Sequence, residues 1–242
     1  MLKKINRNLV AKLDKIFYPN YSNNWDDWML RDLILKYIKS TDRILDVGAG
    51  RGILESMNFK GKVQEVIGVD PVEEVKQNPY LDKGFVGLGD SMPFFEDEQF
   101  DLVFSDNVLE HIESPDTFYQ EVGRVLKKGG YFIAKTPNKY HYMPLFASLT
   151  PTSFHKFYNK LKGRSAEDTF PTRYRANTKK DQKRHGAKYE LKLIDFFSVE
   201  GRPEYLRVTF LTYPAGIFYG FLVNKLGLDN FKIVSFSVMQ KV

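Results

Sequence analysis

The segment RILDVGAGRG, residues 43–52, joins a short apolar run to three glycines at alternate positions. The apolar run predicts a buried strand, and the glycines permit a sharp turn and a close approach to a ligand that side chains would obstruct. A second apolar run, residues 66–69, ends at Asp70. In the order strand, glycine turn, helix, strand, acid, the carboxylate comes about twenty residues after the turn, where it can accept hydrogen bonds from ribose hydroxyls. The segment therefore predicts a cradle for a nucleotide-type ligand.

Strands and helices alternate around this segment. Residues 26–39 have helical spacing, with acids in the first turn and lysines in the last. The elements expected after the glycine turn are a short helix at 52–57, strands at 66–70, 84–87 and 101–105, a helix at 115–126 ended by Lys127-Lys128-Gly129-Gly130, and a strand at 131–136. This alternation predicts an α/β fold with a doubly wound, mostly parallel sheet.

The pattern changes after Pro137. Residues 138–176 are rich in aromatic, basic and turn-forming residues without a clear period, which favours an inserted cap on the substrate side. The elements expected beyond it are a helix at 177–185 ended by Gly186, a strand at 190–199, a helix at 202–226 broken near Pro214, and a final strand at 231–241 that can pair antiparallel. We expect one domain over 1–242, made of amino-terminal helices (1–40), a core (41–137), the insertion (138–188) and terminal strands and helices (189–242).

Composition narrows the setting of the protein. The 242 residues include no cysteine, which excludes disulfides, thiolate chemistry and cysteine-based zinc sites, and is compatible with a cytoplasmic location. Residues 1–20 are basic and amphipathic but lack the apolar core of a secretory signal. Residues 208–223 are the most apolar segment and are too short for an ordinary membrane span. We expect them to form a buried or interfacial helix, which leaves peripheral contact with the inner face of a membrane open.

Positive charge is concentrated in one region. The net charge is +6, and residues 156–192 hold twelve Lys/Arg against four Asp/Glu. Such a stretch can attract nucleic acid, anionic lipid or a phosphorylated acceptor, and a solvated surface is an equally weighted alternative. Nucleic acid is disfavoured because no basic and aromatic RNA-binding signature accompanies the charge.

Two other phosphate-binding patterns do not fit. A dinucleotide fingerprint requires a glycine at the sixth position of the turn, and this position is Ile53. A P-loop would require a glycine-rich segment ending in Gly-Lys-Ser/Thr, which the sequence lacks. The glycine turn is thus not explained by either of the common pyrophosphate cradles.

Residues 43–136 resemble class I S-adenosylmethionine-dependent methyltransferases, in the small-molecule group that includes ubiquinone-biosynthesis-like enzymes. The segments that carry the resemblance are the glycine turn with Asp70, residues 89–94 (GDSMPF), residues 100–112 (FDLVFSDNVLEHI) and residues 124–130 (RVLKKGG). The resemblance implies a Rossmann-like, seven-stranded sheet. It also implies S-adenosylmethionine as cofactor and S-adenosylhomocysteine as product.

The same resemblance assigns the cofactor-binding residues. The turn against the methionine part of the cofactor maps to Asp46, Gly48, Ala49, Gly50 and Gly52, although Asp46 could instead fix the turn without touching the cofactor. Asp70, followed by Pro71, matches the acid that binds the ribose hydroxyls. Asp90, with Ser91 and Met92 beside it, matches the adenine-binding loop, where Met92 could also be plain core. The loop under the reactive methyl group maps to Asp106, Asn107 and Val108.

Two histidines are candidates for a general base. A sulfonium methyl is already activated, so a base is optional for amines and phenolates but useful for a sugar hydroxyl. His111 ranks first because it follows the fourth strand, and His141 ranks second because it lies just beyond the fifth. Structural hydrogen bonding is the alternative for both. His155 and His185 are expected on the surface or in the cap.

The acceptor is expected over the carboxyl ends of the strands, between the amino-terminal helix and the insertion. Aromatic side chains that could line it are Tyr18, Tyr21, Trp25, Tyr140, Tyr142, Phe146, Phe154, Phe157, Tyr158 and Tyr174. Core packing is the alternative for each of these rings. Arg173 and Arg175 could bind a phosphate or carboxylate, or belong to a solvated surface.

The preferred hypothesis is O-methylation of a sugar, or of a glycan- or lipid-linked small acceptor, by analogy with methyltransferases of surface-polysaccharide synthesis. A second hypothesis is C- or O-methylation of a quinone-like or other apolar aromatic molecule, which the apolar segment 208–223 would favour. A third, of another class, is a non-catalytic protein that retains the cofactor fold and binds nucleic acid or membrane.

Overall fold

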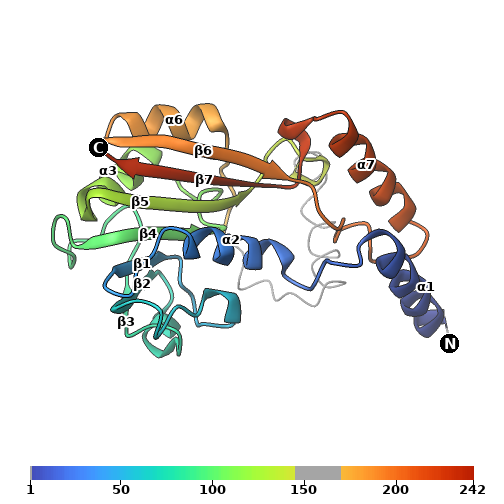
Figure 1. Ribbon diagram of the computed structural model, residues 1–242, viewed down its shortest axis with the longest axis horizontal. Coiled ribbons are helices and arrows are strands. Elements are labelled where there is room, and N and C mark those ends of the chain that lie inside the picture. Colours follow the sequence, from blue (N-terminus) through green and yellow to red (C-terminus); the bar gives the residue numbers. More distant parts are fainter. Residues whose placement is uncertain (1, 145–169) are drawn as a thin grey trace. The chain divides into compact units, whose positions relative to one another are not determined.

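A computed structural model describes residues 2–144 and 170–242 of the chain (Figure 1). The chain divides into two compact units. Unit 1 comprises Met1–Trp25, Asn138–Thr169 and Ser198–Val234, and unit 2 comprises Asp26–Pro137, Phe170–Phe197 and Ser235–Val242.

Unit 2 is built on a seven-stranded sheet with the order β3-β2-β1-β4-β5-β7-β6. The strands are β1 (Arg43–Val47), β2 (Glu65–Asp70), β3 (Lys83–Val86), β4 (Phe100–Asp106), β5 (Leu126–Pro137), β6 (Leu191–Val199) and β7 (Val234–Lys241). β1 pairs in parallel with β2 and β4, as do β2 with β3 and β4 with β5. The arrow of β7 runs opposite to that of β6 (Figure 1). The predicted mostly parallel, Rossmann-like sheet is confirmed.

The chain order of the strands places the site. From β1 the sheet grows through β2 and β3 on one side and through β4 and β5 on the other. Ligands of such sheets bind outside the carboxyl ends of the strands where the order reverses. Val47, the last residue of β1, pairs with Val69 of β2 and Ser105 of β4, so the residues that follow these three strands meet at one edge.

Helices and an apolar core support the sheet. The helices of this part are α2 (Trp25–Leu35), α3 (Pro115–Val125) and α6 (Lys179–Ala187), with the 3₁₀ turns η1 (Glu55–Met57) and η2 (Glu73–Gln77). The interiors of β1, β2 and β4 are buried almost continuously, as expected for parallel strands covered on both faces. α3 adds Phe118, Tyr119 and Val122 to the same core.

The predicted helix at 52–57 is reduced to the single turn η1. Gly52 has a φ of +75°, and Leu54 before η1 is extended. The Arg31 guanidinium donates to the carbonyls of Ser56 (2.6 Å) and Asn58 (2.7 Å). In a continuing helix these carbonyls would accept hydrogen bonds from backbone N–H groups. Here the Arg31 side chain of α2 donates to them instead, and the helix does not continue.

Other boundaries differ by several residues. α2 ends at Leu35 and not at 39, and α6 begins after the Thr178 cap, whose hydroxyl accepts the Asp181 N–H, and continues through Gly186. β5 begins at Leu126, earlier than predicted, because the Lys127–Gly130 segment is an irregularity within the strand. Phe100 pairs with Leu126 and Leu102 with Tyr131, so four residues bulge between the two pairs.

Unit 1 contains α1 (Leu2–Phe17), α7 (Tyr213–Lys225) and the turn η4 (Asp229–Phe231). Asp14 of α1 accepts hydrogen bonds from Arg207 (2.6 and 2.8 Å) and from the Tyr213 hydroxyl (2.6 Å), which ties α1 to the start of α7. The predicted helix at 202–226 is present only from Tyr213. Asn6 of α1 binds the carbonyl of Val208 and the N–H of Phe210, so backbone groups that a helix would use are taken.

Candidate active site

The glycine turn after β1 is held by backbone hydrogen bonds. The N–H groups of Gly48 and Ala49 donate to the Val69 carbonyl of β2 (2.8 and 3.3 Å). Gly48 (φ +86°) has no room for a side chain, because a Cβ there would lie 2.3 Å from Val108. Gly50 (φ +53°) differs: a Cβ there would meet nothing within 4 Å. The turn is therefore packed at Gly48 and open at Gly50, as a cradle requires.

Asp70 holds the same turn from the end of β2. Its carboxylate accepts the N–H of Gly50 (2.8 Å) and of Val72 (3.0 Å), one on each oxygen. The side chain is thereby fixed beside the open side of the turn, and each oxygen keeps a further lone pair. The exposed Pro71 follows. This geometry fits the predicted acceptance of two ribose hydroxyls.

Asn78, which sequence reasoning missed, supports the turn from the far side. It is buried, and its amide donates to the carbonyls of Ala49 (2.9 Å) and Gly50 (3.2 Å) while its oxygen accepts from Tyr80. A Cβ at Gly52 would lie 2.2 Å from the Asn78 side-chain oxygen, so Gly52 is needed for this contact. The Asn78-Pro79 pair signals a turn in the sequence, but not its partner.

Asp46 is a buried acid beneath the turn. It is 5% exposed, and burial, followed by the nearby carboxylates of Asp106 and Asp70, raises its pKa well above the usual range. Among the residues described, its side chain makes no hydrogen bond or ion pair. An amino or ammonium group of a ligand would supply the donor that this carboxyl lacks.

Lys135, also missed, lies at the centre of a buried ionic cluster. Its ammonium is completely buried and contacts the carboxylates of Asp26 (2.9 Å), Asp27 and Asp106 (2.8 Å). Burial alone would lower the pKa of Lys135, but the three carboxylates raise it above its usual range. The cluster fixes Asp106 at the end of β4, and Asn107 (φ +54°) follows, its N–H bonded to the Lys135 carbonyl.

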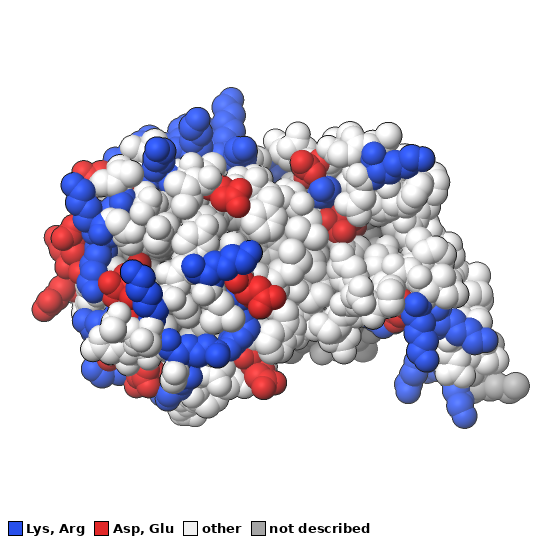
Figure 2. Space-filling view, viewed as in Figure 1, with Lys and Arg blue, Asp and Glu red and all other residues white. Residues whose placement is uncertain are grey.

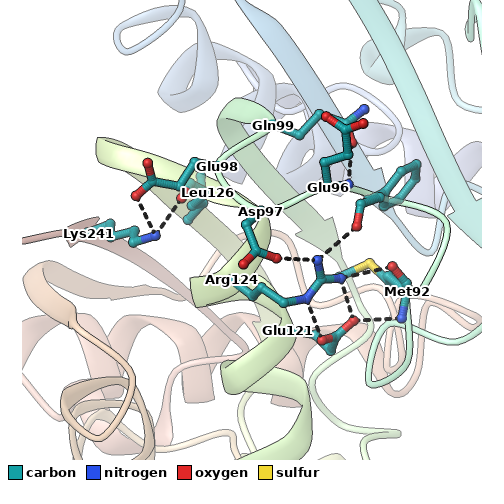
Figure 3. Close-up of polar contacts among 10 residues, drawn as sticks. Met92, Glu96, Asp97, Glu98, Gln99, Glu121, Arg124, Leu126 and Lys241 are labelled. Atoms are coloured by element: carbon teal, nitrogen blue, oxygen red, sulfur yellow. Dashed lines mark hydrogen bonds and ion pairs between the residues drawn. The ribbon is translucent and has the colours of Figure 1, made fainter.

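The loop 89–94 is fixed by α3 (Figure 3). Glu121 accepts the Met92 N–H (2.7 Å), and Arg124 donates to the Met92 carbonyl (2.9 Å). Met92 itself is fully buried, so its role in this loop is that of core and anchor. The Ser91 N–H is also used, by the Leu88 carbonyl. Asp90 is half-buried and makes no side-chain hydrogen bond within the described chain, so its carboxylate is the group left for a ligand.

His111 follows β4 in a turn. Its Nδ1 lies 3.2 Å from the Pro171 carbonyl, and Phe170 packs edge-on at 6.1 Å. Because a carbonyl only accepts, Nδ1 carries the proton in this hydrogen bond, and Nε2 of the neutral ring keeps its lone pair. Nε2 lies 3.9 Å from the Glu110 carboxylate, beyond a direct hydrogen bond. The His111 side chain is 31% exposed.

Glu110 connects His111 to the interior. Its carboxylate accepts from the Thr136 hydroxyl (3.0 Å), which in turn accepts from the Asn177 amide (2.5 Å). Burial raises the pKa of Glu110 to about 8. A neutral or partly ionised carboxyl therefore lies beside the candidate base.

The comparisons with known proteins agree with this geometry. The family described as "Methyltransferase domain" matches residues 45–134, which run from β1 to β5 and include the glycine turn, Asp70, Asp90 and His111. The chain carries a class I, S-adenosylmethionine-dependent methyltransferase domain.

Relatives of this methyltransferase domain align over part of their length. An uncharacterized methyltransferase of Schizosaccharomyces pombe is 34% identical over 63% of this chain and 66% of that protein. The mitochondrial ubiquinone biosynthesis O-methyltransferase of Homo sapiens is 35% identical over 46% of this chain and 35% of that protein. The chain thus spans between about a third and two thirds of the length of these curated relatives.

A solved structure shares the fold. It is geranyl diphosphate C-methyltransferase of Streptomyces coelicolor, in complex with Mg²⁺, geranyl diphosphate and S-adenosylhomocysteine. The TM-score is 0.55 at 17% identity, with 90% of this chain and 77% of that chain covered.

The predicted substrate residues fall in both units. In unit 2, Arg173 and Arg175 are exposed and both contact Glu113 (2.6 and 2.9 Å), which follows His111 by two positions. Two guanidinium groups share one carboxylate there, so the group keeps a net positive charge next to the methyltransferase loop after β4. Sequence reasoning did not anticipate Glu113.

In unit 1, Tyr21 and Trp25 are in edge-to-face contact (5.3 Å), and Tyr142 packs on His141 (4.1 Å), whereas Tyr140 is largely exposed. His141 is 1% exposed, with Nε2 3.7 Å from the buried Glu200 and Nδ1 3.4 Å from the Met143 N–H. Both ring nitrogens thus face groups of the protein. In unit 2, His185 is buried and pairs with Asp116 (2.6 Å). Phe146, Phe154, His155, Phe157 and Tyr158 lie outside the described residues.

A substitution at the open glycine separates ligand contact from backbone strain. Gly50→Ala places a methyl group in the cradle, and we expect the affinity for S-adenosylhomocysteine to fall at least tenfold in calorimetric titration. Gly61→Ala is the matched control, because Gly61 also has a positive φ (+77°) and open space around it. Both changes should cost about 1–3 kcal/mol of stability from backbone strain, and only the first should weaken binding. Equal affinities would contradict the cradle.

Glu110 should make stability depend on pH. Its pKa is about 8 in the native state against a reference value of 4.5, so between these values the native state holds a proton that the unfolded state has lost. Stability therefore falls as pH rises from about 5 to 8, by up to about 1.4 kcal/mol per pH unit. Glu110→Gln cannot titrate and should flatten this fall in urea unfolding at pH 5, 6, 7 and 8. The exposed Glu113→Gln should leave the slope unchanged, and an equal slope in Glu110→Gln would refute the assignment.

Proposed function

We propose that this chain is an S-adenosylmethionine-dependent O-methyltransferase whose acceptor is a hydroxyl of a sugar, in a glycan- or lipid-linked small molecule. The observation that carries the proposal is His111, whose Nδ1–H is held by the Pro171 carbonyl and whose Nε2 is left as a base. An alkyl hydroxyl is a poor nucleophile until it loses its proton, so it is the acceptor class that gains most from such a group. We place the enzyme in the cytoplasm, at the inner face of a membrane.

Three carboxyl groups would hold the cofactor. Asp70 would accept the ribose hydroxyls, Asp90 the exocyclic amine of adenine, and Asp46 the ammonium of the methionine part. The open face at Gly50 leaves room for the ligand backbone. When bound, the cofactor supplies an electrophilic methyl group.

The remaining residues would act on the acceptor. His111 Nε2 would take the proton of the acceptor hydroxyl, whose oxygen would receive the methyl group as the bond from that group to sulfur breaks and S-adenosylhomocysteine leaves. The Glu110 carboxyl would offset the charge of the imidazolium only where it is ionised, above about pH 8. Asp106, Asn107 and Val108, in the loop after β4, would bind the cofactor beside its methyl group and so position the reacting groups. Tyr21, Trp25, Tyr140 and Tyr142 stay candidates for the acceptor walls, Arg173 and Arg175 for an anionic group on it, and His141 for a second base. Residues 138–188 stay the proposed substrate-side insertion.

A quinone-like acceptor is the second candidate. It is favoured by the similarity to a ubiquinone biosynthesis O-methyltransferase and by the apolar side chains exposed on α7. A phenolic hydroxyl ionises more readily than a sugar hydroxyl, so its methylation depends less on His111.

Transfer of a labelled methyl group distinguishes the acceptors. The protein is incubated with S-adenosylmethionine labelled in the methyl group and, separately, with glycolipid and nucleotide-sugar fractions and with demethylated quinols. We expect label in a sugar methyl ether, lost by more than tenfold in His111→Ala, whose affinity for S-adenosylhomocysteine should be unchanged. If only the quinol is labelled, the acceptor is the quinone-like second candidate and not a sugar. If His111→Ala transfers the methyl group as well as the wild type does, His111 is not the general base.

A further inference from the structure

Helix α1 presents an array of cations to solvent. It contains Lys3, Lys4, Arg7, Lys12 and Lys15 and a single acid, Asp14, which Arg207 and Tyr213 occupy. Within residues 2–144 and 170–242, none of the five cations has an ion-pair partner. Figure 2 shows blue groups over α1. The five cations of this helix are therefore available to an anionic partner outside the described chain.

The same unit exposes large apolar side chains. On α7, Phe218 is 65% and Phe221 57% exposed, and Leu211 just before the helix is 75% exposed. At the end of α1, Ile16 is 68% and Phe17 51% exposed. Figure 2 shows a largely uncharged surface over α7. We call these five residues the apolar face of unit 1.

One cavity joins the two helices of this face. It measures about 480 Å³ and is lined by Phe17 and Tyr18 from the end of α1 and by Ile217, Gly220, Phe221, Asn224 and Lys225 from α7. Phe17 and Phe221 of the apolar face thus border the same hollow, and Lys225 places a further cation at it. The contacts of Asp14 with Arg207 and Tyr213 tie the end of α1 to the start of α7. Phe17 and Phe221 therefore belong to one surface, and Phe218 lies one helical turn from Phe221 on α7.

We propose that the apolar face of unit 1, with the cations of α1, docks onto a bilayer that contains anionic lipid. An amphipathic basic helix beside exposed aromatic and aliphatic residues is the arrangement by which proteins lie in a membrane interface. Large exposed apolar patches mark an interaction site, and the unpaired cations select an anionic partner. No helix among the described residues is long and apolar enough to span the bilayer. The inference rests on the proposed function to the extent that docking brings the enzyme to a lipid-linked acceptor.

Vesicle sedimentation tests the docking. The full chain is mixed with vesicles of neutral phosphatidylcholine alone, or with 30 mol% phosphatidylglycerol as the anionic probe, at about 0.1 M salt. We expect binding to the anionic vesicles at least tenfold tighter than to the neutral ones. Lys12→Glu with Lys15→Glu should weaken binding more than tenfold, because each basic residue near such a surface contributes about fivefold. Phe218→Ser with Phe221→Ser should also weaken it at least tenfold.

Matched variants separate this surface from general attraction of positive charge. Lys179→Glu with Lys180→Glu removes the same charge from the basic stretch of unit 2 and should change vesicle binding less than threefold. Equal losses in both lysine pairs, or no loss in the phenylalanine pair, would overturn docking through this face. Loss of a dimer in the phenylalanine pair without loss of vesicle binding would show that a second copy of the chain, and not lipid, covers it.

Cofactor titration keeps this proposal distinct from the proposed function. All three double variants should bind S-adenosylhomocysteine like the wild type, because none of the changed residues belongs to the glycine turn or to the loops after β2 and β4. Asp70→Asn, in contrast, should bind vesicles normally and lose the cofactor. If the wild-type chain binds vesicles but not the cofactor, the proposed enzyme function is refuted and the docking surface is supported. If it binds the cofactor but not vesicles, the docking surface is refuted and the proposed function is unaffected.

Discussion

Asp70→Asn is expected to lower the affinity for S-adenosylmethionine and S-adenosylhomocysteine by about 100-fold. The Asp70 carboxylate accepts the N–H groups of Gly50 and Val72, one on each oxygen, and each oxygen keeps a further lone pair for a ligand hydroxyl. An amide keeps one oxygen but turns an NH₂ group toward a backbone donor, so the turn loses one anchor. A hydrogen bond to a charged group is worth about 1.5–3 kcal/mol, so losing the charge and one ribose contact accounts for about two orders of magnitude.

Asp82→Asn is the matched control for this substitution. The Asp82 carboxylate also accepts a backbone N–H, from Val66 at 2.8 Å, but it does so near the start of β2 and β3, away from the carboxyl ends. Calorimetric titration should give wild-type affinity for Asp82→Asn. An Asp70→Asn protein that binds S-adenosylhomocysteine within threefold of the wild type would contradict the assignment of the ribose acid.

Lys135→Met is expected to be the most destabilising single change, at about 3–5 kcal/mol of unfolding free energy. Lys135 is completely buried among the carboxylates of Asp26, Asp27 and Asp106. Without the ammonium, Asp27 and Asp106 must stay buried as unpaired charges or take up protons. Urea unfolding at pH 7 measures the loss, and adding Asp106→Asn to Lys135→Met should restore part of it.

An exposed ion pair supplies the comparison. Lys127 contacts Asp101 at 2.8 Å, but the lysine side chain is 42% exposed, so Lys127→Met should cost less than about 1 kcal/mol. If Lys135→Met costs no more than Lys127→Met, the cluster does not hold the end of β4 in place.

The strand pattern could be predicted because it depends on local periodicity. The short apolar runs at 43–47 and 66–70 are typical of strands buried in a parallel sheet, and they form β1 and β2 in the structure. The glycine turn was predictable for the same reason, since Gly48 and Gly50 adopt positive φ values that favour glycine. The residues that follow such strands then share an edge by topology alone, which brings Asp70 and Asp106 together.

What could not be predicted depends on partners distant in the sequence. The acids at 26–27 were explained as helix-dipole residues, yet both face Lys135, more than a hundred positions away. Helix propagation after Gly52 is stopped by Arg31, and the helix expected from 202 is delayed by Asn6. Asn78 and Glu113 likewise act through contacts with segments that no periodicity identifies. When a side chain distant in the sequence takes the hydrogen bonds of backbone groups, a helix begins or ends at a residue that the local sequence does not indicate.

The most direct test of the central claim is calorimetric titration of the wild-type chain with S-adenosylhomocysteine, with NAD⁺ titrated in parallel. The glycine turn with Ile53 at its sixth position, the acid after β2 and the free Asp90 carboxylate predict one molecule of S-adenosylhomocysteine bound per chain with micromolar affinity, and no heat from NAD⁺. No binding of S-adenosylhomocysteine at millimolar concentration, or tighter binding of NAD⁺, would contradict the identification of the cradle as a methyl-donor site.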